Sequence, residues 1–385
     1  MSIYCYLLLI YLLRAKRILY GWYAEQQHRD FYPSFRYFTF LARSPYISNF
    51  EDAVERISPL PENLVCGGAL LTPNVVQTAC HCIANFIVDP DEDENKTFAQ
   101  PLNVWEDRIY SCYGQAQTVE MYEWLIPKHY ITYTACRRLE GLAQFVMFDY
   151  GLIITKDKVN EKSPHAMISY APAYRARDLQ KFYYNTIQKE YTCLFIGHGG
   201  WQTMVDDNGY YVEVDEPSDF VRWGWRPTMN YVDCLSVTYS PLKRDLFYYN
   251  YTGESTWVCH QGQYEHDITF NIFKGDSGGP VICNGVYFAV NSFSSSVYSL
   301  DVISYTSPIV HTHFENAVEF RTNFHTWCDN RASDIPDDAE PHPEDPRASV
   351  TPPPIDQRST APRSTSNILS HFLVLSYSVT AFYFL

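Results

Sequence analysis

The sequence carries little positive charge for a chain of 385 residues. Lys and Arg number 29 against 44 Asp and Glu, which gives a formal net charge of −15. A protein that binds phosphate backbones needs a basic face, so this balance argues against a nucleic-acid partner. Hydrophobic residues make up 46% and charged residues 19%, a composition that is typical of a globular chain rather than a disordered one.

The chain also begins without a hydrophobic run long enough to cross a bilayer. Residues 1–13 are apolar, but a membrane span needs about 20 such residues. We interpret residues 1–17 as a signal segment with a short pro-piece. Because basic residues follow this run at 14–17 (RAKR) and none precedes it, a short signal anchor and an incorrectly assigned start are alternatives.

Lys and Arg are absent from residues 368–385 at the end of the sequence as well. Residues 331–367 are rich in Pro, Asp, Glu, Ser and Thr, which predicts an extended stalk without a packed core. Residues 368–385 are mostly apolar. Small residues followed by such a tail predict a glycosylphosphatidylinositol signal, which would tether a secreted protein to the outer cell surface. A membrane-spanning segment is the alternative.

Cysteine and aromatic residues, by contrast, are plentiful. Eleven cysteines favour disulfides and an oxidising compartment, and secretion is the simplest interpretation. Asn95 and Asn250 each begin an N-x-T glycosylation motif that has meaning only in a secreted chain. Aromatic runs at 191–196 and 286–290, separated by Gly and Pro turns, favour an all-β barrel architecture.

Three polar residues suggest nucleophilic catalysis. Ser277 lies in the run GDSGGP at 275–280, where glycines let successive N–H groups aim at one point. His81, in TACHC at 78–82, is the candidate base that activates this serine. Asp149 enters an apolar run, and a buried carboxylate needs a partner such as an imidazole N–H.

In the chain order His, Asp, Ser, and over residues 18–330, the sequence resembles the chymotrypsin-like serine proteases. The resemblance rests on CGGALL at 66–71, TACHC at 78–82, DYGLI at 149–153, GHG at 197–199 and GDSGGP. It implies an all-β fold of two packed six-stranded antiparallel β-barrels with a C-terminal helix, expected over 308–327. It also implies that His81, Asp149 and Ser277 are catalytic, and that the N–H groups of Gly275 and Ser277 form the oxyanion hole.

The resemblance further implies an activation step. In the family, cleavage after a basic residue frees an isoleucine ammonium, which pairs with the Asp beside the catalytic serine. Here these positions are Arg17, Ile18 and Asp276, within RILYG at 17–21. Two of the four residues of the family's motif differ, and a basic flank after a membrane-targeting segment is the other interpretation.

The substrate pocket is inferred from the same alignment. Asn271 occupies the position at which trypsins carry an Asp, so the pocket lacks a fixed counter-ion for Lys or Arg. Ser292, Phe293 and Ser294 resemble the family's Ser-Trp-Gly substrate strand, and Ser294 in place of Gly would narrow the entrance.

Six cysteines match family bridges: Cys66 with Cys82, Cys193 with Cys283, and Cys234 with Cys259. One further family bridge is missing at both ends, because Phe273 replaces one cysteine and residues 294–298 contain none. Cys80, Cys112, Cys136 and Cys328 could form two additional bridges of unknown pairing. We reject a metal site at residues 80–82, because neighbouring side chains on a strand point to opposite faces.

Two classes of function remain. The first is a serine endopeptidase that needs no cofactor and no metal, acts on protein or peptide substrates, and is open to serpin-type inhibitors. The second is a non-catalytic homologue that binds a partner, and the fold alone does not decide between them. A general esterase would use the same residues.

Overall fold

The computed structural model describes a set of ranges within one compact unit, residues 16–350. They are residues 22–23, 36–45, 64–88, 97–113, 123–139, 142–162, 170–172, 179–198, 203–205, 211–213, 221–238, 257–261, 264–265, 268–269, 272, 275–295 and 303–309. Strands dominate these ranges, as the aromatic runs and turn residues predict. Within them, no helix is long and apolar enough to cross a membrane.

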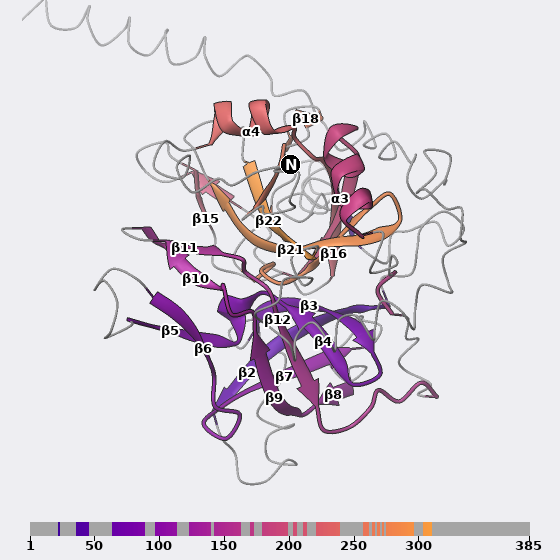
Figure 1. The fold of residues 1–385 in the computed structure, drawn as a ribbon. Helices are drawn as coiled ribbons and strands as arrows, with labels where there is room; N and C mark the ends of the chain where they lie inside the picture. The colour runs from indigo at the N-terminus through magenta and orange to yellow at the C-terminus, as the bar shows by residue number, and fades with distance from the viewer. Residues whose placement is uncertain are drawn as a thin grey trace, which may run out of the picture. The chain divides into compact units, whose positions relative to one another are not determined.

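The first half of the chain forms a seven-stranded antiparallel sheet (Figure 1). Hydrophobic strands such as VVQT at 75–78, where every residue is buried, place its side chains in the core. The strand order is β8 (Glu123–Leu125), β7 (Asp107–Tyr113), β2 (Phe38–Pro45), β3 (Leu64–Thr72), β4 (Val75–Thr78), β12 (Gly151–Thr155) and β9 (Pro127–Thr132).

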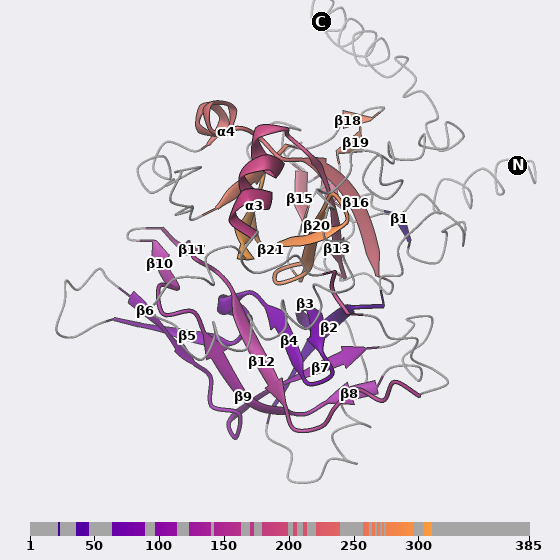
Figure 2. The ribbon, with the colours of Figure 1, turned by 45° about the vertical axis from the view of Figure 1, so that its right-hand side comes forward.

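The second half, together with a short strand near the N-terminus, forms another seven-stranded antiparallel sheet, visible from a second direction in Figure 2. Its order is β1 (Trp22–Tyr23), β16 (Arg222–Pro227), β13 (Thr192–Gly197), β20 (Pro280–Cys283), β21 (Val286–Ser295), β22 (Ile303–Pro308) and β17 (Val258–His260). The two antiparallel sheets confirm the all-β, two-barrel expectation; among the described residues each sheet has seven strands and includes a short edge strand, β8 in the first and β1 in the second.

Four small hairpins and two helices complete the described fold. The hairpins pair β5 (Ala84–Val88) with β6 (Thr97–Pro101), β10 (Arg137–Leu139) with β11 (Leu142–Met147), β14 (Thr203–Val205) with β15 (Tyr211–Glu213), and β18 (Tyr264–Glu265) with β19 (Ile268–Thr269). The helices are α3 (Leu179–Gln188) and α4 (Tyr231–Val237). The expected C-terminal helix lies outside the described residues beyond Ile309.

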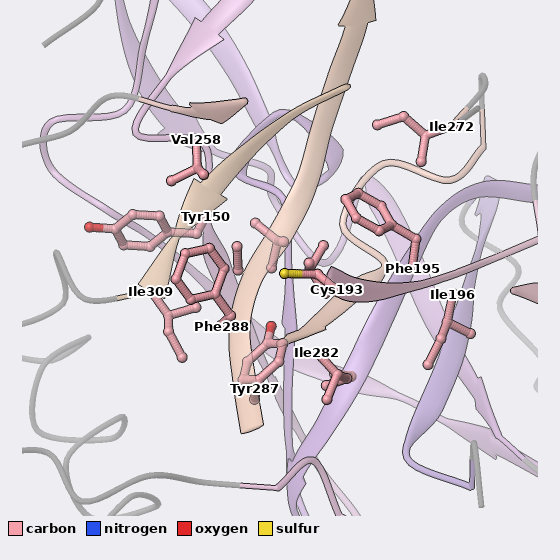
Figure 3. Packing of buried hydrophobic residues seen from close by; sticks show 14 of the residues in the cluster. Tyr150, Cys193, Phe195, Ile196, Val258, Ile272, Ile282, Tyr287, Phe288 and Ile309 are labelled. Atoms are coloured by element: carbon pink, nitrogen blue, oxygen red, sulfur yellow. The ribbon is translucent and has the colours of Figure 1, made fainter. Parts of the chain in front are cut away.

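The core of the second sheet is rich in aromatic rings, several of which Figure 3 shows close together. Tyr287 and Phe288 on β21 and Phe195 on β13 are all at most 2% exposed. Helix α3 covers this sheet through Tyr183, whose ring stacks on that of Phe288 at 5.6 Å. Full burial of a side chain of this size stabilises the fold by about 1.5–3 kcal/mol.

Four disulfides cross-link the described fold. Three join the cysteines that the resemblance pairs, namely Cys66–Cys82, Cys193–Cys283 and Cys234–Cys259, and the fourth is Cys80–Cys136. Such a number is typical of extracellular or secreted proteins, which fold in oxidising compartments.

Candidate functional site

His81 lies in a short 3-10 helix, Cys80–Cys82, that follows strand β4. Both of its neighbours in sequence are bridged: Cys82 to Cys66 on β3, and Cys80 to Cys136 before β10. The backbone is therefore held on both sides of His81, while the His81 side chain remains 28% exposed. This geometry fixes the backbone of a residue whose ring can still meet a substrate.

Asp149 lies two residues before β12 and is fully buried. Its Oδ2 is 2.6 Å from His81 Nδ1, and its Oδ1 accepts a hydrogen bond of 2.9 Å from the His81 backbone N–H. Ser292 Oγ donates a third bond, also of 2.6 Å, to Oδ2. These donors compensate for burying the charged carboxylate, which would otherwise be costly.

The protonation of His81 reflects two opposing effects. Burial lowers the pKa of the imidazole, but the charge of Asp149 and the hydrogen bond to its carboxylate raise it, and the net result is a pKa above the ordinary 6.5. The positive charge of Arg138 also lowers the pKa of His81, and it is the smallest of these effects. A paired carboxylate therefore makes this histidine a stronger base than a free one.

Ser277 lies in the turn before strand β20, and its hydroxyl contacts Ser292 of strand β21. Its Oγ donates a hydrogen bond of 3.4 Å to the backbone oxygen of Ser292, the residue whose hydroxyl binds Asp149. Among the described contacts, the Ser277 hydroxyl bonds to Ser292 and not to His81. Ser292 therefore connects the serine to the His81–Asp149 pair, a role that its place in a substrate strand did not indicate.

The glycines around Ser277 are required by close packing between the two sheets. Gly278 has a φ of +79°, and a Cβ there would collide with Thr78 Oγ1 and with the backbone oxygen of Gly67. The Gly67 N–H donates a hydrogen bond of 2.7 Å to the backbone oxygen of Ser277. The serine is thus docked by a main-chain hydrogen bond onto strand β3.

Some backbone N–H groups of this turn donate hydrogen bonds within the protein, and others do not. Gly278 N–H donates to the Asn291 oxygen and Gly279 N–H to the Asp276 oxygen. The N–H groups of Gly275, at a φ of +98°, and of Ser277 are not engaged by the residues that the structure describes. Unengaged neighbouring N–H groups are what an oxyanion site needs.

Beyond Ser292, two side chains shape the next part of strand β21. Phe293 stacks on Tyr305 at 4.6 Å and makes edge contacts with Phe145 and Trp257. Ser294 Oγ donates a hydrogen bond of 3.0 Å to the backbone oxygen of Ile272, which is itself 3% exposed. This bond crosses from the expected substrate strand to the segment before Ser277. Asn271 and Phe273 lie outside the described residues, as do Arg17, Ile18, Asn95, Asn250 and Cys328.

Two groups of possible metal ligands surround His81, and neither can hold an ion through thiolates. Ligand atoms of Cys66, His81 and Cys82 lie within 4.8 Å of one another, and so do those of Cys80, Cys136 and Asp149. All four sulfurs are in disulfides. The sequence-based expectation that residues 80–82 lie on a strand was wrong, because they form a 3-10 helix.

Two antiparallel sheets thus bring a histidine and an aspartate of the first half to a serine of the second half. The fold is chymotrypsin-like. No family model and no curated protein matches the sequence. Among the solved structures that resemble it is neuropsin, a serine protease expressed in the limbic system of mouse brain, with 13% identity and a TM-score of 0.47 over 76% of this chain and 95% of that one.

Proposed function

We propose that this chymotrypsin-like chain is a serine endopeptidase that hydrolyses peptide bonds through an acyl-enzyme on Ser277. The observation that supports this proposal best is the contact set of Asp149, whose carboxylate binds both the His81 imidazole and the Ser292 hydroxyl. A buried acid aligned on an imidazole beside a serine in a glycine turn is the arrangement that nucleophilic catalysis needs.

In the proposed reaction, His81 accepts the Ser277 hydroxyl proton while the serine oxygen attacks the carbonyl carbon of the substrate. The N–H groups of Gly275 and Ser277 stabilise the oxyanion that forms. His81 then donates the proton to the departing amine, which leaves Ser277 acylated. Water, deprotonated by His81, releases the acid and restores the hydroxyl.

This reaction requires one small movement. Ser277 Oγ now faces the Ser292 backbone oxygen, and a change of side-chain rotamer about the Cα–Cβ bond would turn it toward the imidazole. Hydrogen bonds of catalytic groups are often long or misaligned without substrate and tighten in the complex.

The remaining parts of the proposal concern the division of the chain into regions and the partners of the protease. Residues 1–17 would be a signal segment with a pro-piece, 18–330 the protease region, 331–367 a stalk, and 368–385 a membrane-anchoring signal. The partners would be protein or peptide substrates with neutral residues on the acyl side, since Asn271 offers no counter-charge. Serpin-type inhibitors would be a second class of partner.

A covalent probe tests the proposal directly. Ser277→Ala should abolish hydrolysis and fluorophosphonate labelling, with a loss on the order of 10⁶-fold in rate, while secretion continues. Ser236→Ala, at an exposed hydroxyl on α4, is the matched control and should label like the wild type. A secreted wild-type protein that neither labels nor hydrolyses peptides would favour the non-catalytic homologue, to which the bond between Ser277 and Ser292 also lends support.

A further inference from the structure

Three charged side chains are buried on or next to the second sheet. Arg222 and Arg226 on β16 are 2% and 1% exposed, and Asp276, next to the candidate nucleophile, is 1% exposed. Removing a charge from water costs several kcal/mol unless an opposite charge and hydrogen bonds compensate for it. Three such groups on one sheet therefore call for a common explanation.

The register of the strands places Asp276 beside Arg222. Arg222 pairs with Gly197 of β13, and a Cβ on Gly197 would collide with the Asp276 carboxylate. Directly paired residues of antiparallel strands project to the same face, with Cβ atoms about 4.5–5.5 Å apart. The carboxylate thus occupies the space that glycine leaves open, on the face of the sheet from which Arg222 projects.

Arg226 lies four residues, or two pleat repeats, further along the same face. It pairs with Cys193, its Nη1 donates a hydrogen bond to Ser304 Oγ, and its guanidinium lies 6.0 Å from the centre of the Phe195 ring. Burial lowers the pKa of Arg226 to about 9, and the negative charge of Asp276 acts in the opposite direction. The guanidinium remains charged at neutral pH.

Two buried histidines next to these arginines stay neutral. Burial lowers the pKa of His198 to about 4, and the Arg222 charge contributes to that shift. The pKa of His260 is likewise lowered by burial and by the charge of Arg226. Neither imidazole supplies a positive charge to Asp276 at neutral pH, which leaves the two guanidiniums as the described cations that face it.

We infer that Arg222 and Arg226 hold the Asp276 carboxylate inside the second sheet and thereby position the Gly275–Ser277 turn before any cleavage after Arg17. They are positioning residues. Only the expected effect on kcat rests on the proposed function; the expected effect on stability does not. In the family that the sequence resembles, this charge comes from a new N-terminal ammonium, whereas here Arg222 projects from the same face of the sheet as the carboxylate and Arg226 feels its negative charge in the intact chain.

The place of β1 supports the same inference. Tyr23 pairs with Arg222, and Trp22 pairs with Trp223. A new N-terminus at Ile18 would begin four residues before Trp22, so an ammonium released there would approach a region that already contains two guanidiniums. Because like charges repel strongly when buried, a third cation adds little to the binding of one carboxylate.

Blocking the cleavage is the first test, with the full-length secreted protein. Arg17→Gln should keep the fluorophosphonate labelling rate and the peptide turnover within about threefold of the wild type, as should the matched control Lys16→Gln. Arg222→Gln should lower kcat at least tenfold with little change in KM, and Arg222→Lys should restore most of it because the charge returns. A loss of more than tenfold in Arg17→Gln alone would overturn the inference.

A second measurement does not depend on catalysis. Arg222→Gln and Asp276→Asn should each lower the melting temperature, and the double variant should lose no more than the worse single variant, because each single change leaves one buried charge without its partner. Losses that add in the double variant would refute the pairing even in an inactive protein. Coupled losses in a protein that never labels would keep the pairing and reject the proposed function.

Discussion

The two sheets hold their parts of the candidate site by different means. In the first sheet, two disulfides fix the neighbours of His81, and one of its two core clusters is lined by apolar side chains such as Leu41, Leu70 and Ile153. In the second sheet, the residues around Asp276 and Ser277 include buried arginines and a buried histidine. Covalent bonds fix the backbone around His81, the candidate base, and buried charges are proposed to position the turn of Ser277, the candidate nucleophile.

This difference has a physical consequence for control. A disulfide holds its geometry over a wide range of pH and salt, whereas the free energy of a buried ion pair depends on every charge near it. The second sheet is therefore the half in which activity can be adjusted by a local change in charge.

Removing the covalent support of the first sheet should have the largest effect on stability. The Cys80–Cys136 bridge closes a loop of 56 residues, and the chain-entropy argument assigns about 4 kcal/mol to a loop of that size. We expect the double variant Cys80→Ser, Cys136→Ser to lose about that much free energy of unfolding in denaturant titration. Cys112→Ala, at the buried unpaired cysteine of β7, is the control and should lose less. If both variants lost the same free energy of unfolding, the disulfide would contribute nothing beyond the packing of its side chains.

Acid should act on the second sheet through its buried histidines. The pKa of His198 is about 4 in the folded chain and 6.5 when unfolded, so the unfolded state binds more protons between these values. Stability should fall as pH drops from about 6.5 to 4, by about 3 kcal/mol for this residue. His198→Phe should flatten that limb of the stability profile in thermal melts, while His129→Gln, at an exposed histidine of β9, should leave it intact. An unchanged profile in His198→Phe would contradict the assignment.

The smallest effect concerns the strand beside the nucleophile. Ser294→Gly removes the hydrogen bond to the Ile272 oxygen, which should cost about 1 kcal/mol of stability. The same change widens the space beside Ser277, so kcat/KM should rise severalfold for peptides with large side chains on the acyl side and stay level for those with Ala. A uniform change across both peptide sets would show that Ser294 does not face the substrate.

Much of this arrangement could be predicted from short motifs. GDSGGP, TACHC and the buried Asp149 indicate the histidine, acid and serine because each motif combines a chemical group with the local backbone that it needs. The Cys80–Cys136 bridge could not be predicted, since several cysteines were available and the pairing depends on how β10 lies against the His81 turn. The buried arginines were missed for a similar reason: Arg222 and Arg226 flank two tryptophans in RWGWRP, and burial follows only from the register with β13.

The pairing of β1 with β16 also sets the order in which the chain can fold as it is made. Tyr23 emerges early from the ribosome, but its partner Arg222 follows about 200 residues later, which at 5–20 residues per second is about 10–40 s. The first sheet, built from residues between 38 and 155, is complete well before then. Strand β1 therefore waits without its partner β16 through most of synthesis, so the second sheet can be completed only after the first is already folded.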